Sequence, residues 1–149
     1  MTKFIYQMEN ILSIKYKMED QAKISYGLAR VKLNEEEDKL FALKNKANLY
    51  QDKKRNLMQS KLKLFEIRKC EEAIEITKHH ITLQQIAVKK AEKQLENARL
   101  RLNAAMMERK THEKLKENAL NEFFIEYEAE QRKEIDELVS YKYNSPANY

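Results

Sequence analysis

The chain contains very little glycine and proline, the two residues that most often interrupt helices. Its 149 residues include one of each, Gly27 and Pro146, where average usage would give roughly ten glycines and seven prolines. Gly27 lies within an otherwise helical pattern, and Pro146 lies in the last few residues. Almost nothing between them can end a helix. The sequence therefore predicts long helices with very few turns and excludes most enzyme folds.

Cysteine, tryptophan and long apolar runs are also scarce or absent. The single Cys70 excludes an intramolecular disulfide and a cysteine zinc cluster, and one unpaired thiol suits a reducing compartment. No apolar run approaches the ~18 residues of a membrane-spanning helix. The first residues lack the sustained apolar run of a signal peptide. We therefore expect a soluble, cytoplasmic protein.

Charged and helix-forming residues dominate the composition. Charged residues make up 36% of the chain and apolar residues 42%, which is typical of coiled coils when the apolar residues are periodic. They recur at alternating steps of three and four, the spacing of a coiled-coil seam. The first series is Ala22, Tyr26, Ala29, Leu33, Leu40, Leu43, Ala47, Tyr50 and Leu57, with Glu36 and Lys54 in its two gaps. The second series is Ile67, Cys70, Ile74, Thr77, Ile81, Gln84, Val88, Ala91, Leu95, Ala98, Leu102 and Ala105.

The two series differ in phase, and the polar stretch 51–61 separates them. This pattern predicts an all-α fold in which two long helices form an antiparallel coiled-coil hairpin, with the C-terminal helix longer. We expect helix 1 at about 3–56, a turn at about 57–61, helix 2 at about 62–141 and a flexible tail at 142–149, all in one domain spanning 1–149. Facing residue numbers should then sum to about 120, which pairs Leu33 with Val88 and Leu40 with Ile81.

The C-terminal end of the second helix is expected to extend about 25 residues beyond the first helix. Beyond about residue 106 the heptad changes phase, and the apolar positions become Leu115, Leu120, Phe124, Tyr127, Ile135 and Leu138. An aromatic stripe without a partner in the hairpin predicts docking on another protein. Charge is polarised as well. The stretch 39–69 has ten basic and two acidic residues, and the stretch 122–137 has seven acidic and two basic ones.

No group of residues forms a credible catalytic or metal site. Gly27, the one glycine, cannot make a phosphate-binding loop. His79 and His80 are adjacent and would point about 100° apart on a helix. Glu108 and His112 are spaced for one helix face, but two ligands alone make a poor metal site. We therefore expect no catalytic residue, no metal, no cofactor and no enzymatic activity.

A net charge of +5 brings nucleic acid and membrane surfaces into consideration. The basic run Lys53–Arg55, with Lys61 and Lys63 nearby, could contact phosphates without sequence preference. No known nucleic-acid-binding module is present, and the acidic C-terminal end opposes such binding. A basic coiled coil lying on a membrane would need longer helices and more basic residues along one face. We expect no nucleic-acid partner.

Two stretches of the sequence resemble a known family. They are residues 3–15 with 19–23, KFIYQMENILSIK and EDQAK, and later Glu108–Lys110, Glu113–Glu117, Tyr127 and Glu130–Leu138. In order and spacing these residues resemble the flagellar type III export protein FliJ over nearly the whole chain. Many members carry a glycine at the hairpin turn, and this chain has none there.

The resemblance implies an antiparallel two-helix stalk without enzymatic activity. Such a stalk inserts its terminal end into the flagellar export ATPase ring and contacts the cytoplasmic domain of the export gate nearer the hairpin tip. Export chaperones are a further implied class of partner, and the implied location is cytoplasmic, associated peripherally with the membrane's inner face through the export apparatus. The implied ring contacts are Leu115, Phe124, Tyr127, Glu130, Gln131, Lys133, Asp136 and Glu137, and the implied gate contacts are Leu40, Leu43, Tyr50, Ile74 and His80.

The main alternative is a purely structural role. One continuous helix could dimerise in parallel with a second copy, or the chain could serve as a scaffold spacer. Both alternatives use the same heptad pattern.

Overall fold

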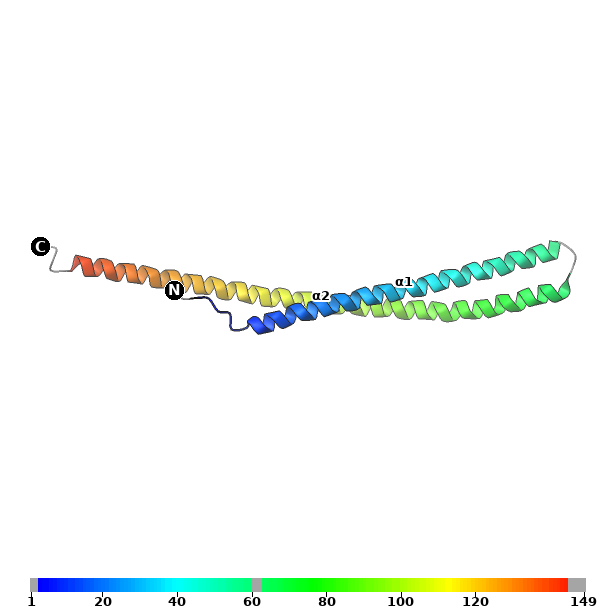
Figure 1. Cartoon of the computed structure of the whole chain (residues 1–149), viewed down its shortest axis with the longest axis horizontal. Helices are drawn as coiled ribbons and strands as arrows, with labels where there is room; N and C mark the ends of the chain where they lie inside the picture. Colours follow the sequence, from blue (N-terminus) through cyan, green and yellow to red (C-terminus); the bar gives the residue numbers. More distant parts are fainter. Residues whose placement is uncertain (1–2, 60–62, 145–149) are drawn as a thin grey trace. The chain divides into compact units, whose positions relative to one another are not determined.

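The computed structural model describes residues 3–59 and 63–144, and these residues form two long helices (Figure 1). Helix α1 spans Glu9–Gln59 and helix α2 spans Leu64–Tyr143, with lengths of 51 and 80 residues. No strand occurs among the described residues. The predicted all-α antiparallel hairpin with a longer C-terminal helix is confirmed.

The helix ends differ from the expected ones by a few residues. Helix α1 begins six residues later than expected and ends three residues later, and α2 begins and ends two residues later. Of the turn expected at 57–61, residues 57–59 are helical, and residues 60 and 61 lie outside the described residues. Of the tail expected at 142–149, residues 142–143 are helical, and 145–149 lie outside the described residues.

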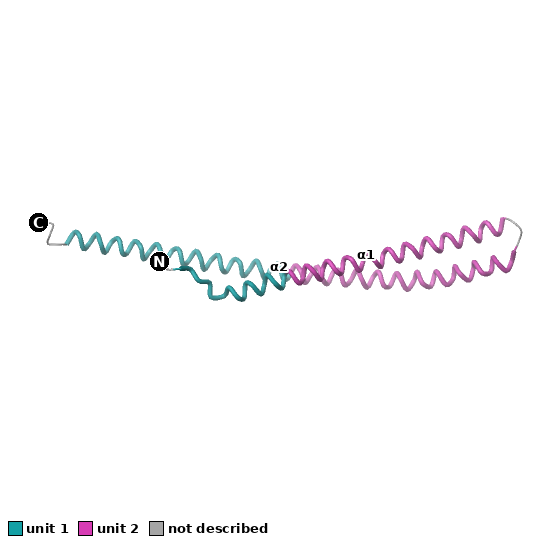
Figure 2. Tube along the Cα trace, viewed as in Figure 1, with its two compact units in different colours: residues 1–19, 104–149 teal, residues 20–103 magenta. Residues whose placement is uncertain are grey.

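The chain divides into two compact units, each of which pairs part of α1 with part of α2 (Figure 2). We call residues 20–103 the hairpin unit. Residues 1–19 and 104–149 form the terminal unit.

The seam of the hairpin unit consists of the residues that the heptad pattern singled out. Every residue of both predicted series is buried or half-buried. At the centre Leu33, Val88 and Ala91 form a buried cluster, and Leu40 and Leu95 pack against it. Leu33 and Val88 come together as the predicted register requires. Their burial removes apolar surface from water, the main favourable contribution to helix pairing.

Glu36 interrupts this apolar seam and is satisfied by both helices. Its carboxylate lies 2.9 Å from Lys32 Nζ and 3.6 Å from Lys39 Nζ on α1. From α2, Gln84 donates its side-chain amide to both the carboxylate and the backbone carbonyl of Glu36. The hydrogen bonds from Lys32 and Gln84 lower the pKa of Glu36 to about 2. A buried carboxylate is tolerated here because its acceptor sites are filled.

In the terminal unit the buried face of α2 does not change phase in the way expected. Its non-exposed residues continue at steps of three and four, and a second row one residue further on widens the face. The first row is Ala105, Arg109, His112, Lys116, Ala119 and Phe123, and the second is Met106, Glu113, Leu120 and Tyr127. Of the apolar positions expected there, Leu120 and Tyr127 belong to this face, whereas the others are exposed, namely Leu115, Phe124, Ile135 and Leu138. The heptad therefore persists in this unit. An apolar pattern does not reveal it, because charged side chains occupy several of its positions.

Candidate functional site

A network of charged side chains joins the two helices of the terminal unit. Arg109 of α2 forms an ion pair with the buried Glu19 of α1 and donates from Nη1 to Glu113 Oε2 at 2.9 Å. Tyr16 donates its hydroxyl to the other oxygen of Glu113. The pKa of Glu113 is lowered, first by the hydrogen bond from Tyr16 and then by the one from Arg109. The hydrogen bond between Tyr16 and Glu113 also raises the pKa of Tyr16. Because these bonds require fixed partners, they favour one register between the helices.

Two more ion pairs cross between the helices of this unit. Lys15 Nζ lies 2.9 Å from Glu108 Oε2, which lowers the pKa of Glu108, and Lys116 Nζ lies 2.8 Å from Glu9 Oε2. His112 has a buried Nδ1 without a hydrogen-bond partner among the described residues. Within the same residues no group of three or more His, Cys, Asp or Glu side chains could hold a metal ion. The carboxylate of Glu108 is instead used to join α2 to α1.

Aromatic side chains form a cluster around Phe123. The ring of Phe4, from the segment before α1, lies 5.4 Å from the Phe123 ring between centroids. On α2, Phe124 and Tyr127 lie 6.0 and 6.4 Å from Phe123. Phe4, Phe123 and Tyr127 are half-buried, while Phe124 is exposed. The sequence prediction missed the contact between Phe4 and Phe123, because nothing in the heptad pattern brings the N-terminal segment onto α2.

Helix α2 extends beyond α1 by about as many residues as expected, because Lys116 pairs with Glu9, the first residue of α1, and α2 continues to Tyr143. The first part of this extension is not without a partner, because Phe4 of the N-terminal segment reaches Phe123. From Glu128 to Tyr143 every residue of α2 is exposed. This stretch, which we call the exposed C-terminal segment, retains five large apolar side chains. They are Ile135, Leu138, Val139, Tyr141 and Tyr143.

Seven of the eight predicted ring contacts lie in this segment or directly before it. Tyr127 is half-buried in the aromatic cluster, and the other seven are exposed. Glu130, Gln131, Lys133, Asp136 and Glu137 all belong to the exposed C-terminal segment, whereas Leu115 lies two turns before the aromatic cluster. Five of the eight therefore lie on one exposed stretch of helix.

The predicted gate contacts lie in the hairpin unit, mostly inside its seam. Leu40, Leu43 and Tyr50 are half-buried, and Ile74 is buried. His80 is exposed. The four seam residues hold α1 against α2, and their surface is largely covered by the opposite helix. Of the five, only His80 has an exposed side chain.

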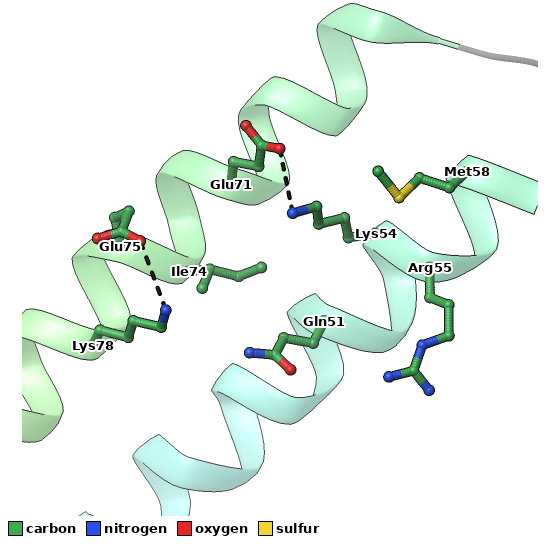
Figure 3. A pocket seen from close by; sticks show the side chains of 8 residues that line it. All are labelled: Gln51, Lys54, Arg55, Met58, Glu71, Ile74, Glu75 and Lys78. Atoms are coloured by element: carbon green, nitrogen blue, oxygen red, sulfur yellow. Dashed lines mark ion pairs between the residues drawn. The ribbon is translucent and has the colours of Figure 1, made fainter.

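An open pocket lies between the helices near the hairpin end (Figure 3). Ile74 of the gate set lines it, together with Gln51, Arg55 and Met58. Two ion pairs border the pocket, Lys54 with Glu71 at 3.2 Å and Lys78 with Glu75 at 3.7 Å. The lining therefore combines these paired charges with Gln51, Arg55 and two apolar residues, Ile74 and Met58.

No helix within residues 3–59 and 63–144 is long and apolar enough to cross a membrane.

The comparisons with known proteins agree with this geometry. The family described as "Flagellar FliJ protein" matches residues 4–148 of the chain. Among solved structures, the chain is similar to a protein from Chlamydia trachomatis described as a YscO homolog, CT670. The two share 22% sequence identity with a TM-score of 0.70, covering 95% of this chain and 96% of the other. That likeness shows a shared two-helix fold. No curated protein sequence matches the chain.

Proposed function

This chain belongs to the family of flagellar FliJ proteins, components of the flagellar type III export apparatus, and we propose that it is a non-enzymatic stalk in that apparatus. The exposed C-terminal segment of α2 binds the export ATPase ring. The hairpin unit contacts the cytoplasmic domain of the export gate. The chain is thereby held at the inner face of the cell membrane through its partners, and export chaperones are a further class of partner.

The observation that carries this proposal is the exposed C-terminal segment itself. Sixteen consecutive helical residues, 128–143, are exposed, yet five of them are large and apolar. Isolated helices gain most of their stability from packing. A helix that keeps an apolar face beyond its intramolecular partner is suited to packing against another protein.

Two distinct rows of side chains run along α2 from just before the exposed C-terminal segment into it. Phe124, Tyr127, Gln131, Ile135 and Leu138 follow one another at steps of three and four, so they share one helix face. A neighbouring row contains Glu126, Glu130, Lys133 and Glu137. The apolar row supplies contact area, and the largely acidic row beside it selects a basic surface on the ring.

Charge reversal tests the ring contact. We expect Glu130→Lys combined with Glu137→Lys to weaken binding to the cognate flagellar export ATPase by about tenfold or more, because two attractive charges become repulsive. The measurement is a titration of labelled chain with ATPase at low salt. The matched control is Glu37→Lys with Asp38→Lys, which makes the same change in net charge at exposed positions of the hairpin unit. Equal weakening by both pairs would contradict a specific ring contact.

A substitution at His80 tests the gate contact and should not disturb folding. His80→Glu is expected to weaken binding to the cytoplasmic domain of the export gate while leaving thermal unfolding unchanged, because His80 is exposed. His79→Glu is the control, since His79 is also exposed and points about 100° away around the helix. If neither variant changes gate binding, His80 is not a gate contact.

A further inference from the structure

The end of the hairpin unit exposes two large apolar side chains at the start of α2. Leu64 and Phe65 are 76% and 71% exposed, among the most exposed large apolar residues of this unit. Side chains on a helix tilt toward its N-terminus. Because α2 begins at Leu64, these two side chains lean toward the end of the hairpin and away from its seam.

Basic side chains surround this apolar pair. The described residues 53–59 and 63–69 contain six Lys or Arg and one acidic residue, Glu66, a net charge of +5. Lys69 Nζ lies 4.5 Å from the centroid of the Phe65 ring, so a cation and an aromatic ring form one compact pair. We call Leu64 and Phe65, with the exposed Lys53, Arg55, Lys63, Arg68 and Lys69, the tip surface.

Apart from Glu66, the described charges nearest the hairpin end are basic. At about 1.5 Å per residue, Lys53 lies about 9 Å from the end of α1, and Lys69 lies about 8 Å from the start of α2. The acidic group Glu71, Glu72 and Glu75 begins only about 10 Å from the start of α2, and Lys54 pairs with the first of these. An interfacial protein segment buries its apolar face about 5–10 Å into the boundary between headgroups and acyl chains. The basic side chains therefore lie within this depth, together with the single carboxylate of Glu66, and the acidic group Glu71, Glu72 and Glu75 begins at its limit.

We propose that the tip surface binds an anionic lipid surface directly. Leu64 and Phe65 enter the boundary between headgroups and acyl chains, and the surrounding Lys and Arg side chains pair with lipid phosphates and carboxylates. A bilayer adapts to two side chains that project from the end of a hairpin, whereas an acidic protein would need a cavity shaped for them. The proposal is independent of the proposed function, because it involves neither the ATPase nor the gate.

Vesicle binding by the full chain tests this inference. We expect co-sedimentation with phosphatidylcholine vesicles in which phosphatidylserine makes up about one-third of the lipid, little with pure phosphatidylcholine, and weaker binding at high salt. Leu64→Ser with Phe65→Ser should weaken the anionic-vesicle binding by about tenfold. Lys63→Glu with Lys69→Glu should weaken it at least as much. Circular dichroism checks that both double variants keep their helix content.

Matched controls separate a tip contact from general stickiness or charge. Ile24→Ser with Leu28→Ser removes two similarly exposed apolar residues from the outer face of α1. Lys89→Glu with Lys90→Glu reverses two exposed charges in the middle of the second helix. Both controls should bind anionic vesicles like the unaltered chain. The proposal is overturned if the unaltered chain does not bind anionic vesicles. It is also overturned if a control loses as much vesicle binding as the tip variant it is matched to. If the tip surface binds an acidic protein and not lipid, the unaltered chain will not bind the vesicles.

Discussion

Gly27 occupies the interior of α1 without any need for glycine. Its φ is not positive, and a Cβ built at this position meets nothing within 4 Å. Glycine in a helix interior costs about 1 kcal/mol relative to alanine. The sequence placed Gly27 within a helical pattern, and its position in α1 is consistent with that interpretation.

Gly27→Ala should therefore stabilise the protein. We expect an increase of about 1 kcal/mol in the free energy of unfolding, because alanine loses less backbone entropy on folding. Urea denaturation followed by circular dichroism measures the change. A loss of stability would mean that a close neighbour occupies the space beside Gly27.

Glu36 is the residue whose titration should be visible in the stability of the hairpin. Its folded-state pKa of about 2 lies below the ordinary value of 4.5. The stabilisation from its ionised form is therefore present above pH 4.5 and lost as the pH falls from 4.5 toward 2. Lys32, Lys39 and Gln84 supply the interactions that protonation weakens.

Glu36→Gln should flatten this part of the pH profile. We expect the thermal midpoint of the variant to fall less than that of the unaltered chain between pH 5 and about pH 2. Glu35→Gln, at a neighbouring exposed position, is the control and should leave the profile unchanged. Parallel profiles for the unaltered chain and Glu36→Gln would show that Glu36 is not selectively stabilised in its ionised form.

At the scale of whole helices, the heptad pattern predicted which face of each helix is buried. The prediction succeeded in the hairpin unit because many residues contribute to one periodic signal, and the helix ends were placed less accurately. Helix α1 begins at Glu9 rather than near residue 3, and Phe4 contacts Phe123 instead of extending the helix. Such a contact depends on residues far apart in the sequence, which no local pattern contains.

The same limit explains the charged seam of the terminal unit. An apolar pattern passes over Arg109, His112 and Lys116, although all three are half-buried. Arg109 is tolerated there because Glu19 and Glu113 pair with it. The sequence shows each of these charges, but their partners become apparent only once α1 and α2 are aligned.

A pair of leucine substitutions measures the importance of the seam. Leu33 is 7% exposed and Leu28 is 66% exposed, both on α1 of the hairpin unit. We expect Leu33→Ala to cost about 2–4 kcal/mol of unfolding free energy, as substitutions in well-packed cores do. Leu28→Ala should change stability by at most about 0.5 kcal/mol, the usual range for surface positions. Similar costs at the two positions, measured by urea denaturation, would contradict the assigned seam.

At the scale of the whole molecule, antiparallel pairing within one chain removes the need for a second copy. The continuous helix of the parallel-dimer alternative differs from the two helices observed. The chain divides into two compact units, and the expectation that they form one domain stays a prediction. The contact residues also stay predictions, because exposure shows which of them are available and does not show what they bind.

Because the seam residues of α1 and α2 pack against each other within one chain, we predict that the protein is a monomer. We expect light scattering to give a mass near 17.9 kDa at micromolar concentration, since the seam positions of each helix are already covered by the other. A stable mass of twice this value would favour the structural-dimer alternative over the stalk.

Stimulation of the cognate export ATPase by a truncated chain tests the stalk proposal most directly. A chain ending at Ala129 lacks most of the exposed C-terminal segment but keeps the aromatic cluster and every ion pair between α1 and α2 described above. It should therefore retain its thermal midpoint. We expect the full chain to raise the rate of ATP hydrolysis and the truncated chain to lose most of that effect. Full stimulation by the truncated chain would contradict the assignment of the segment 130–143 to the ATPase ring.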